Sequence, residues 1–135
     1  MSDATPLDVP PLGDDTRLRL RIHFGDRLML GPGKADLLEG IRDTGSIAAA
    51  GRAMSMSYKR AWSLVEDMNA AFKEPLVASA RGGTKGGGAH LTETGEAVLA
   101  QYRAIVAETE VATKARIAAI RGLLVESTSD MSKGK

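Results

Sequence analysis

The sequence predicts a mainly helical fold that carries small β-hairpins. Apolar residues recur at steps of three and four in several segments, which is the spacing of one helix face. Near the amino terminus, and again around a glycine-rich loop, short runs suited to strands flank turn residues. The chain has 135 residues, of which 43% are hydrophobic, and this is enough for one core of ordinary size.

The first predicted element is a β-hairpin in residues 17–30. Its turn is Gly25-Asp26, and the sequence Gly31-Pro32-Gly33 is predicted to end it. Residues on its inward face are apolar: Leu18, Leu20, Ile22 and Phe24. Those on its outward face are basic: Arg17, Arg19, Arg21 and His23. We interpret the basic row as a solvated edge, and contact with DNA flanks or a partner subunit is the alternative.

Residues 34–43 are predicted to form the first helix, which Gly45 closes. The inward residues of this helix are Leu37, Leu38 and Ile41. Ser46 can cap a second, short helix in which small residues allow close packing. The polar turn at residues 55–57 then interrupts the helical pattern.

A third helix is predicted to begin at Tyr58, to be capped by Ser57 and to be ended by Pro75. One apolar stripe is expected to face the core: Tyr58, Ala61, Trp62, Val65, Met68 and Phe72. Cations and hydroxyl groups occupy its first turns, whereas the acids Glu66 and Asp67 lie farther along. A helix that enters the major groove needs this polarity, because carboxylates near the phosphates would be repelled. The helix pair therefore indicates a helix-turn-helix that reads double-stranded DNA, and a solvated charged face is the alternative.

Two short strands, residues 76–80 and 89–91, flank a glycine-rich loop. Glycines permit positive φ and expose backbone N–H groups, so such a hairpin tip can approach a phosphate backbone or enter a minor groove. Arg81 and Lys85 supply positive charge. The loop lacks the GxxxxGK[ST] spacing of a nucleotide-phosphate cradle, and a merely flexible connection is the other alternative. Together with the helix pair, this hairpin predicts a winged helix-turn-helix.

The predicted DNA contacts lie on the helix-turn-helix and on the glycine-rich loop. They are Ser46, Ser55, Ser57, Tyr58, Lys59, Arg60, Ser63, Arg81, Gly82, Gly83, Thr84, Lys85, Gly86 and Gly87. The net charge is only +1, but residues 1–16 hold four aspartates and no cation, whereas residues 52–90 hold six Lys or Arg and three acids. This segregation is typical of a basic face on an otherwise neutral protein.

A long helix is predicted over residues 93–121, capped by Thr92. At 1.5 Å per residue it spans roughly 43 Å, which is more than a core of this size can cover. Its broad apolar band consists of Val98, Leu99, Tyr102, Ile105, Val106, Ala112, Ile117 and Ile120. The far part, including Val111 and Ala115, is predicted to pack on the same helix of a second subunit in a two-fold homodimer. A solvent-exposed helix with fraying ends is the alternative.

The folded domain is thus expected at residues 17–122, between a disordered acidic tail at residues 1–16 and a flexible tail at residues 123–135. The acidic, proline-rich amino terminus predicts neither a signal peptide nor a membrane span, and we expect a cytoplasmic protein. The chain has no cysteine and two isolated histidines, which argues against disulfides and metal sites. Without a recognisable set of catalytic groups, we do not expect an enzyme.

Several motifs resemble known families of regulators. Those similar to the helix-turn-helix domain of LysR-type regulators are Gly45-Ser46-Ile47 and Leu91-Thr92-Glu93-Thr94-Gly95. Those that resemble the narrower ModE-type molybdenum-responsive regulators are Ser57-Tyr58-Lys59, Ala61-Trp62, Met68-Asn69 and the loop at residues 82–88. The similarity covers residues 17–119.

This resemblance implies a transcriptional regulator that binds a pseudo-palindromic operator as a dimer, with a link to molybdate uptake or molybdenum metabolism. In that family a C-terminal pair of small β-rich domains binds molybdate, and residues 123–135 are too few to form them. We therefore expect no cofactor in this chain. The alternative function is that of a winged-helix protein-interaction module without direct DNA binding.

Overall fold

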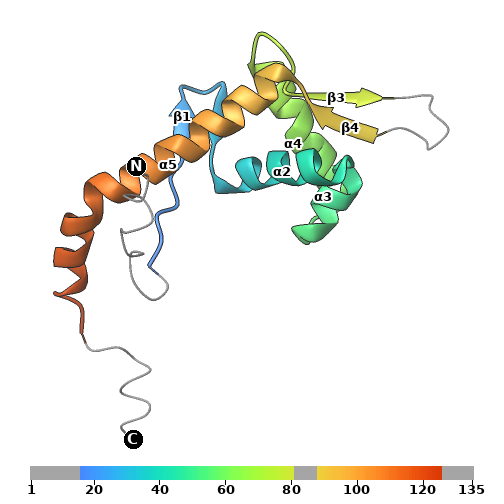
Figure 1. Cartoon of the computed structure of the whole chain (residues 1–135). Coiled ribbons are helices and arrows are strands. Elements are labelled where there is room, and N and C mark those ends of the chain that lie inside the picture. The colour runs from blue at the N-terminus through green and yellow to red at the C-terminus, as the bar shows by residue number, and fades with distance from the viewer. Residues whose placement is uncertain (1–15, 81–87, 126–135) are drawn as a thin grey trace, which may run out of the picture. The chain divides into compact units, whose positions relative to one another are not determined.

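The computed structural model describes residues 16–80 and 88–125. Along the chain it has the hairpin strands β1 (Ile22–Phe24) and β2 (Leu28–Leu30), the helices α2 (Pro32–Thr44), α3 (Ile47–Ala53) and α4 (Tyr58–Ala71), the strands β3 (Val77–Ala80) and β4 (Gly88–Leu91), and the helix α5 (Glu93–Arg121) (Figure 1). The predicted mainly helical fold with two small hairpins is confirmed. Most of the expected tails, residues 1–15 and 126–135, lie outside the described residues.

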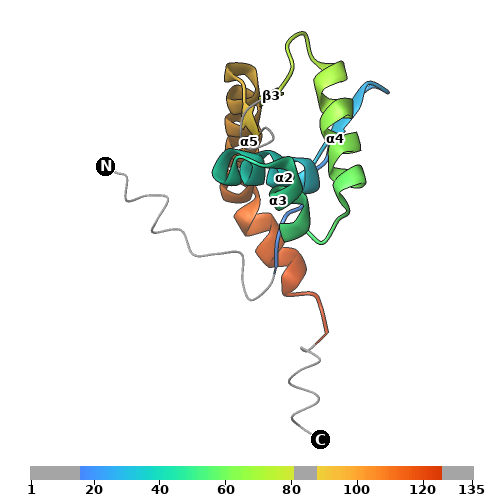
Figure 2. The same ribbon diagram turned by 90° about the vertical axis from the view of Figure 1, so that its right-hand side faces the viewer.

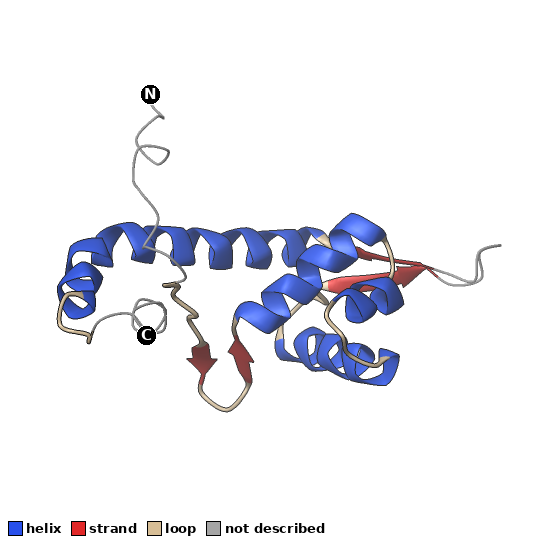
Figure 3. Cartoon of the chain, turned by 90° about the horizontal axis from the view of Figure 1, so that it is seen from below, coloured by secondary structure: helices blue, strands red, loops and turns tan. Residues whose placement is uncertain are grey.

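The residues group into two compact units. One unit is Arg19–Ile105, and the other combines Met1–Leu18 with Val106–Lys135. The first unit holds both hairpins, α2, α3, α4 and the first part of α5, and each hairpin is a separate antiparallel pair of strands (Figure 3).

The first hairpin is shorter than predicted. Ile22 pairs with Leu30 and Phe24 with Leu28, whereas residues 17–21 are not in a strand. The predicted alternation of exposure holds up to Ile22 and fails at Phe24, which is 46% exposed. Phe24 is the last residue before the turn at Gly25, where the sheet is only two strands wide, so no neighbouring strand covers its ring.

Two predicted helix boundaries are wrong for local reasons. Pro32 does not break the chain but is the first residue of α2, because a proline lacks the N–H that has no partner at a helix start and already has a helical φ. At the other end of α2, Gly45 closes the helix with a φ of 73°, as predicted. The α4 helix ends at Ala71, four residues before Pro75, so the proline does not terminate it.

The core of this unit is the group of α2, α3 and α4, which lie together in Figure 2. The aliphatic residues of α2 predicted to face inward, Leu37, Leu38 and Ile41, are fully buried. Helices α3 and α4 cross closely at Gly51, where an added Cβ would lie 2.9 Å from the Cβ of Ala61. A small residue at this crossing is therefore required to hold the two helices at their short separation.

The predicted apolar stripe of α4 is right in its middle and wrong at its start. Ala61, Val65 and Met68 are buried, but Tyr58 is 54% exposed and Leu64, which was not predicted, is buried instead. At about 100° per residue, Leu64 lies about 40° around the helix from Met68 and about 60° from Ala61, so it faces the same core. Tyr58 is the first helical residue and its side chain lies at the open end of the helix.

The chain segment that leads from α4 into β3 is held tightly against the start of α5. Leu76 is fully buried, and its carbonyl oxygen accepts a hydrogen bond from the Thr92 backbone N–H at 2.9 Å. The Thr92 hydroxyl donates to the Pro75 carbonyl at 2.7 Å and accepts from Gly95 N–H at 3.0 Å, which makes it the predicted cap of α5. An added Cβ at Gly95 would lie 2.1 Å from the Leu76 oxygen, so only glycine permits this approach.

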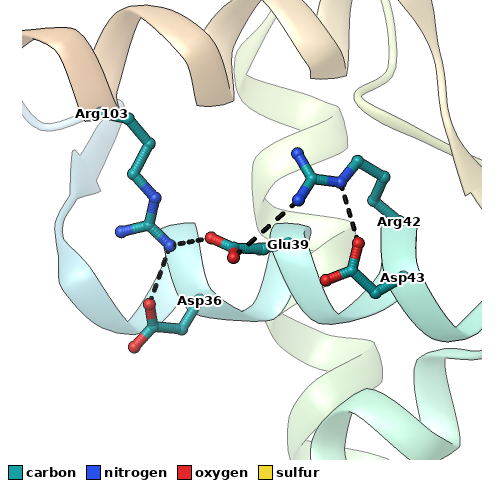
Figure 4. Close-up of polar contacts among 5 residues, drawn as sticks. All are labelled: Asp36, Glu39, Arg42, Asp43 and Arg103. Atoms are coloured by element: carbon teal, nitrogen blue, oxygen red, sulfur yellow. Dashed lines mark hydrogen bonds and ion pairs between the residues drawn. The ribbon is translucent and has the colours of Figure 1, made fainter.

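Two contacts join α5 to the rest of the Arg19–Ile105 unit. The buried Tyr102 hydroxyl donates to the Leu20 carbonyl at 2.6 Å, and burial raises the pKa of Tyr102 above its ordinary value. Arg103 forms ion pairs with Asp36 and Glu39 of α2 (Figure 4). These pairs are solvent-exposed, so each contributes at most about 1 kcal/mol, and the Tyr102 contact is the stronger tie.

The second unit contains the remainder of α5. The buried residues of α5 are Gly95, Leu99 and Tyr102, so no residue after position 102 is buried within the described chain. In this unit Arg121 Nη1 donates to the Thr16 hydroxyl at 2.6 Å. The predicted helix length is confirmed, whereas its packing on a second subunit stays a prediction.

A pair of glycine substitutions tests the close approach at Gly95. Gly95→Ala is expected to lower the free energy of unfolding by at least about 2 kcal/mol, because the new methyl overlaps a backbone carbonyl. Gly33→Ala is the control: it lies in α2 with nothing within 4 Å of an added Cβ, and it is expected to stabilise by about 0.5 to 1 kcal/mol. Urea denaturation measures both, and equal effects of the two substitutions would contradict the clash.

Candidate nucleic-acid interface

The helix-turn-helix is built from two capped helices and a short turn. The Ser46 hydroxyl accepts a hydrogen bond from Ala49 N–H at 2.9 Å and so caps α3, as predicted. The Ser57 hydroxyl accepts from Arg60 N–H at 3.0 Å and caps α4, also as predicted. Each hydroxyl still has its own hydrogen to donate, so a cap can also bond to a phosphate oxygen.

The turn between these helices fixes the direction in which α4 leaves α3. Met54 N–H and Met56 N–H both donate to the Gly51 carbonyl at 3.0 Å. Ser55, which lies between them, has a φ of 60°, in the left-handed region that few residues other than glycine adopt. Its side chain is exposed, and its contact with DNA stays a prediction.

The amino-terminal turns of α4 carry an exposed group of polar and aromatic side chains: Tyr58, Lys59, Arg60 and Ser63. The first turn has no acidic residue, and the exposed acids Glu66 and Asp67 lie about two turns farther along. Within the described part of the chain, Lys59 and Arg60 form no salt bridge. Their positive charge adds to that of the helix amino terminus, so this end of α4 attracts anions.

Seven of the predicted contact residues lie on the helix-turn-helix. They are Ser46 at the start of α3, Ser55 and Ser57 in the turn, and Tyr58, Lys59, Arg60 and Ser63 at the start of α4. The other seven, Arg81 to Gly87, lie outside the described residues. They connect the paired ends of β3 and β4, since Ala80 lies opposite Gly88 and Val77 opposite Leu91. We call these two strands and residues 81–87 the wing hairpin.

Asn69 joins α4 to the wing hairpin, a role that the sequence did not indicate. Its side-chain oxygen accepts from Leu76 N–H at 2.8 Å and from Val77 N–H at 3.0 Å, while its amide nitrogen donates to the Val77 carbonyl at 3.1 Å. One side chain therefore satisfies three backbone groups where β3 begins. The only available signal was a lone asparagine beside the apolar stripe of a helix, where an amide needs a bonding partner.

The described residues contain no group of three or more His, Cys, Asp or Glu placed to hold a metal ion. None of their helices is long and apolar enough to cross a membrane.

Comparison with known proteins points to one kind of regulator. The chain is 42% identical over 83 residues to the transcriptional regulator ModE of Yersinia pestis, covering 62% of this chain and 32% of that protein. It is 47% identical over 98 residues to the molybdenum-pterin-binding protein MopB of Rhodobacter capsulatus, covering 70% and 36%. To the DNA-binding transcriptional dual regulator ModE of Escherichia coli K12 it is 35% identical over 83 residues, covering 62% and 32%.

The chain is similar to ModE and Mop proteins. It spans about a third of the length of these relatives. No family model matches the chain. The predicted resemblance to molybdenum-related regulators is confirmed at this level, and the LysR-like detail stays a prediction.

The role of Asn69 is tested by two substitutions of graded severity. Asn69→Ala leaves three part-buried backbone groups without their partner and is expected to lower the free energy of unfolding by about 2 to 3 kcal/mol. Asn69→Asp keeps the acceptor for two N–H groups and should cost less. Amide hydrogen exchange at Leu76 and Val77 should quicken in Asn69→Ala and much less in Asn69→Asp, which keeps the acceptor of both N–H groups.

Gln101→Ala is the control for these variants, because Gln101 is an exposed residue of α5, and it should change stability by less than about 0.5 kcal/mol. If Asn69→Ala changed stability as little as the control does, Asn69 would not hold the wing hairpin.

Proposed function

We propose that this protein is a transcriptional regulator that binds double-stranded DNA through α4 and the wing hairpin. The observation that carries the proposal is the start of α4. Lys59 and Arg60 form no salt bridge with any described residue there, and they lie on a capped helix end whose first turn has no acid. This arrangement matches what a helix needs to enter the major groove, because its first turns must reach base edges between two rows of phosphates.

The similar proteins support the same function and suggest its biological setting. Their names describe transcriptional regulation, DNA binding and molybdenum transport or molybdenum-pterin binding. We propose that the genes regulated by this protein serve molybdate uptake or molybdenum metabolism. No cofactor is proposed for this chain.

The geometry suggests a division between two kinds of DNA contact, with base contacts made by α4 and backbone contacts made by the wing hairpin. Arg60 and its neighbours on α4 would read base edges in the major groove, where an arginine can donate two hydrogen bonds to guanine. Residues 81–87 would lie on the adjacent backbone or in the minor groove, where Arg81 and Lys85 neutralise phosphates and the glycines allow close approach. The bonds of Asn69 to Leu76 and Val77 support this division, because they join the reading helix to the strand that carries these residues.

We further propose that the protein acts as a homodimer through α5. Beyond Tyr102 this helix has no buried residue, yet it carries Val106, Ile117 and Ile120, the last of which is 62% exposed. Viewed down the helix axis, these residues lie within about 60° of Tyr102, so they extend the apolar face of α5 to which Tyr102 belongs. A two-fold dimer implies a pseudo-palindromic operator, with half-sites about 34 Å apart or a multiple of that distance.

A winged helix can also serve as a protein-interaction module without touching DNA. Binding to random duplex DNA at low and moderate salt separates the two functions, because a protein that neutralises phosphates releases counterions and loses affinity steeply as salt rises. Binding that is absent or insensitive to salt would favour the interaction module. Selection of bound sequences from random DNA would then give the half-site and its spacing.

Two alanine substitutions test this division between base contacts and phosphate contacts. Arg60→Ala is expected to cost about 1 to 3 kcal/mol on the selected operator and to weaken base preference, because it removes a contact with a base edge. Lys85→Ala is expected to weaken binding to selected and scrambled sequences alike and to lower the salt slope by about one, because it removes a phosphate contact. Gel-shift titrations over a range of salt measure both, and identical profiles of the two variants would refute the division.

The dimer proposal is tested by placing a charge on either face of α5. Ile120→Glu is expected to convert the dimer into a monomer, because it puts a carboxylate in the apolar face that continues from Tyr102. Val111, which was predicted from the sequence to pack in the same interface, is also exposed but lies about 180° around the helix from Ile120, so the two residues do not share one face. Val111→Glu is therefore the matched control and should remain a dimer. Sedimentation gives the mass and circular dichroism the fold. A folded Ile120→Glu dimer would count against this interface.

A further inference from the structure

Tyr58 has an exposure that the packing of the protein does not explain. Its ring is 54% exposed, although aromatic side chains of this size usually bury most of their surface. The ring is nevertheless held in place, since its centroid lies 6.4 Å from that of the half-buried Trp62, one turn along α4, with 33° between the planes. This spacing is within the range of favourable aromatic pairs. The structure therefore keeps an apolar surface in water in a defined orientation.

The position of Tyr58 on α4 places this surface at the edge of the candidate interface. At about 100° per residue, Lys59 and Ser63 occupy the centre of the exposed face, whereas Tyr58, Trp62 and Asn69 share one flank. Asn69 is bonded to the start of β3, so this flank is the one turned toward the wing hairpin. The ring of Tyr58 thus lies on the flank toward the wing hairpin, about 100° around the helix from Lys59, while Arg60 lies on the opposite flank, about 160° from the ring.

The chemistry of the major groove offers one apolar partner for such a ring. Hydrogen-bond donors and acceptors line the groove floor, and the C5-methyl group of thymine is the apolar exception. An exposed ring that covers a methyl group removes apolar surface of both from water. The Tyr58 hydroxyl has no hydrogen-bond partner among the described residues, so a phosphate contact by that group is the competing use of this side chain.

We propose that the Tyr58 ring reads the C5-methyl group of one thymine in each half-site, and that Trp62 is a positioning residue that holds the ring for this contact. The inference rests on the proposed DNA-binding function and goes beyond it by naming a base. It assigns specificity at that position to apolar contact and not to a hydrogen bond.

Replacing single thymines by uracil tests the proposal, because the exchange removes the methyl group and leaves every hydrogen-bonding group in place. The full chain is first used to select its site from random duplex DNA. Each thymine of the selected half-site is then replaced in turn. One position is expected to lose about four-fold in affinity, the value of one buried methyl group, and the other positions much less.

Variants of the chain assign this loss to the ring. With Tyr58→Ala the preference for thymine over uracil at that position should disappear, whereas with Tyr58→Phe it should remain, because the ring is kept and only the hydroxyl is lost. Trp62→Leu should reduce the preference, and Trp62→Phe should restore part of it if an aromatic neighbour is what positions the ring. Lys59→Ala should weaken binding to both forms equally and leave their ratio unchanged. Thermal melting confirms that each variant is folded.

The possible results separate failure of the methyl contact from failure of the proposed DNA-binding function. The methyl contact is overturned if no thymine position discriminates, if Tyr58→Ala keeps the preference, or if Tyr58→Phe loses it as Tyr58→Ala does. All three results leave the proposed function intact, because sequence-specific binding itself is still observed. If the selection recovers no preferred sequence and the chain shows no salt-dependent binding, the proposed function fails and this inference fails with it.

Discussion

The backbone of Leu76 is the point at which three elements of the Arg19–Ile105 unit meet. Asn69 of α4 accepts from its N–H, Thr92 at the start of α5 donates to its carbonyl, and Gly95 lets α5 approach that carbonyl without a side chain between them. The two hydrogen bonds satisfy backbone groups that are otherwise costly to bury, because Leu76 is itself fully enclosed. The direction of β3 relative to α4 follows from these contacts, and so does the position of the first turn of α5.

This constraint matters for recognition because DNA contacts demand fixed spacing. In the proposed complex, α4 and the wing hairpin have to meet a duplex whose grooves are rigid on the scale of a side chain, so freedom between α4 and the hairpin would lower affinity through the entropy of ordering. Asn69 removes that freedom with one side chain, and the close crossing of Gly51 and Ala61 does the same between α3 and α4. The residues proposed to touch DNA are exposed, while the residues that position them are buried or hydrogen-bonded.

The structural features that could be predicted from the sequence are those that depend on residues close together in the chain. Ser46, Ser57 and Thr92 are caps in the structure as predicted, because a cap depends on residues three positions apart and on nothing farther away. The apolar stripe of α4 was predicted in its middle, but periodicity gives a direction around the helix and says nothing of whether a neighbour is there, so Tyr58 was assigned to the core and Leu64 was missed. The bonds of Asn69 to Leu76 and Val77 depend on where two elements meet in space, and no local spacing encodes that. The contact residues in the wing hairpin, from Arg81 to Gly87, rest on the sequence alone.

The modest net charge of the chain is compatible with the proposed DNA binding, because what matters for binding is the electrostatic field at the amino-terminal end of α4. Charges farther apart than about 10 Å are largely screened at 0.1 M salt, so the aspartates of residues 1–15 act on Lys59 and Arg60 only if they come close. Along α4 itself, Glu66 and Asp67 lie about 10 Å from the first turn, which is near that limit. The helix dipole and the two cations therefore add at the amino-terminal end, while the acids lie about two turns farther along. The same arrangement favours entry by that end and opposes a reversed orientation, because in the reversed orientation Glu66 and Asp67 would face the phosphates.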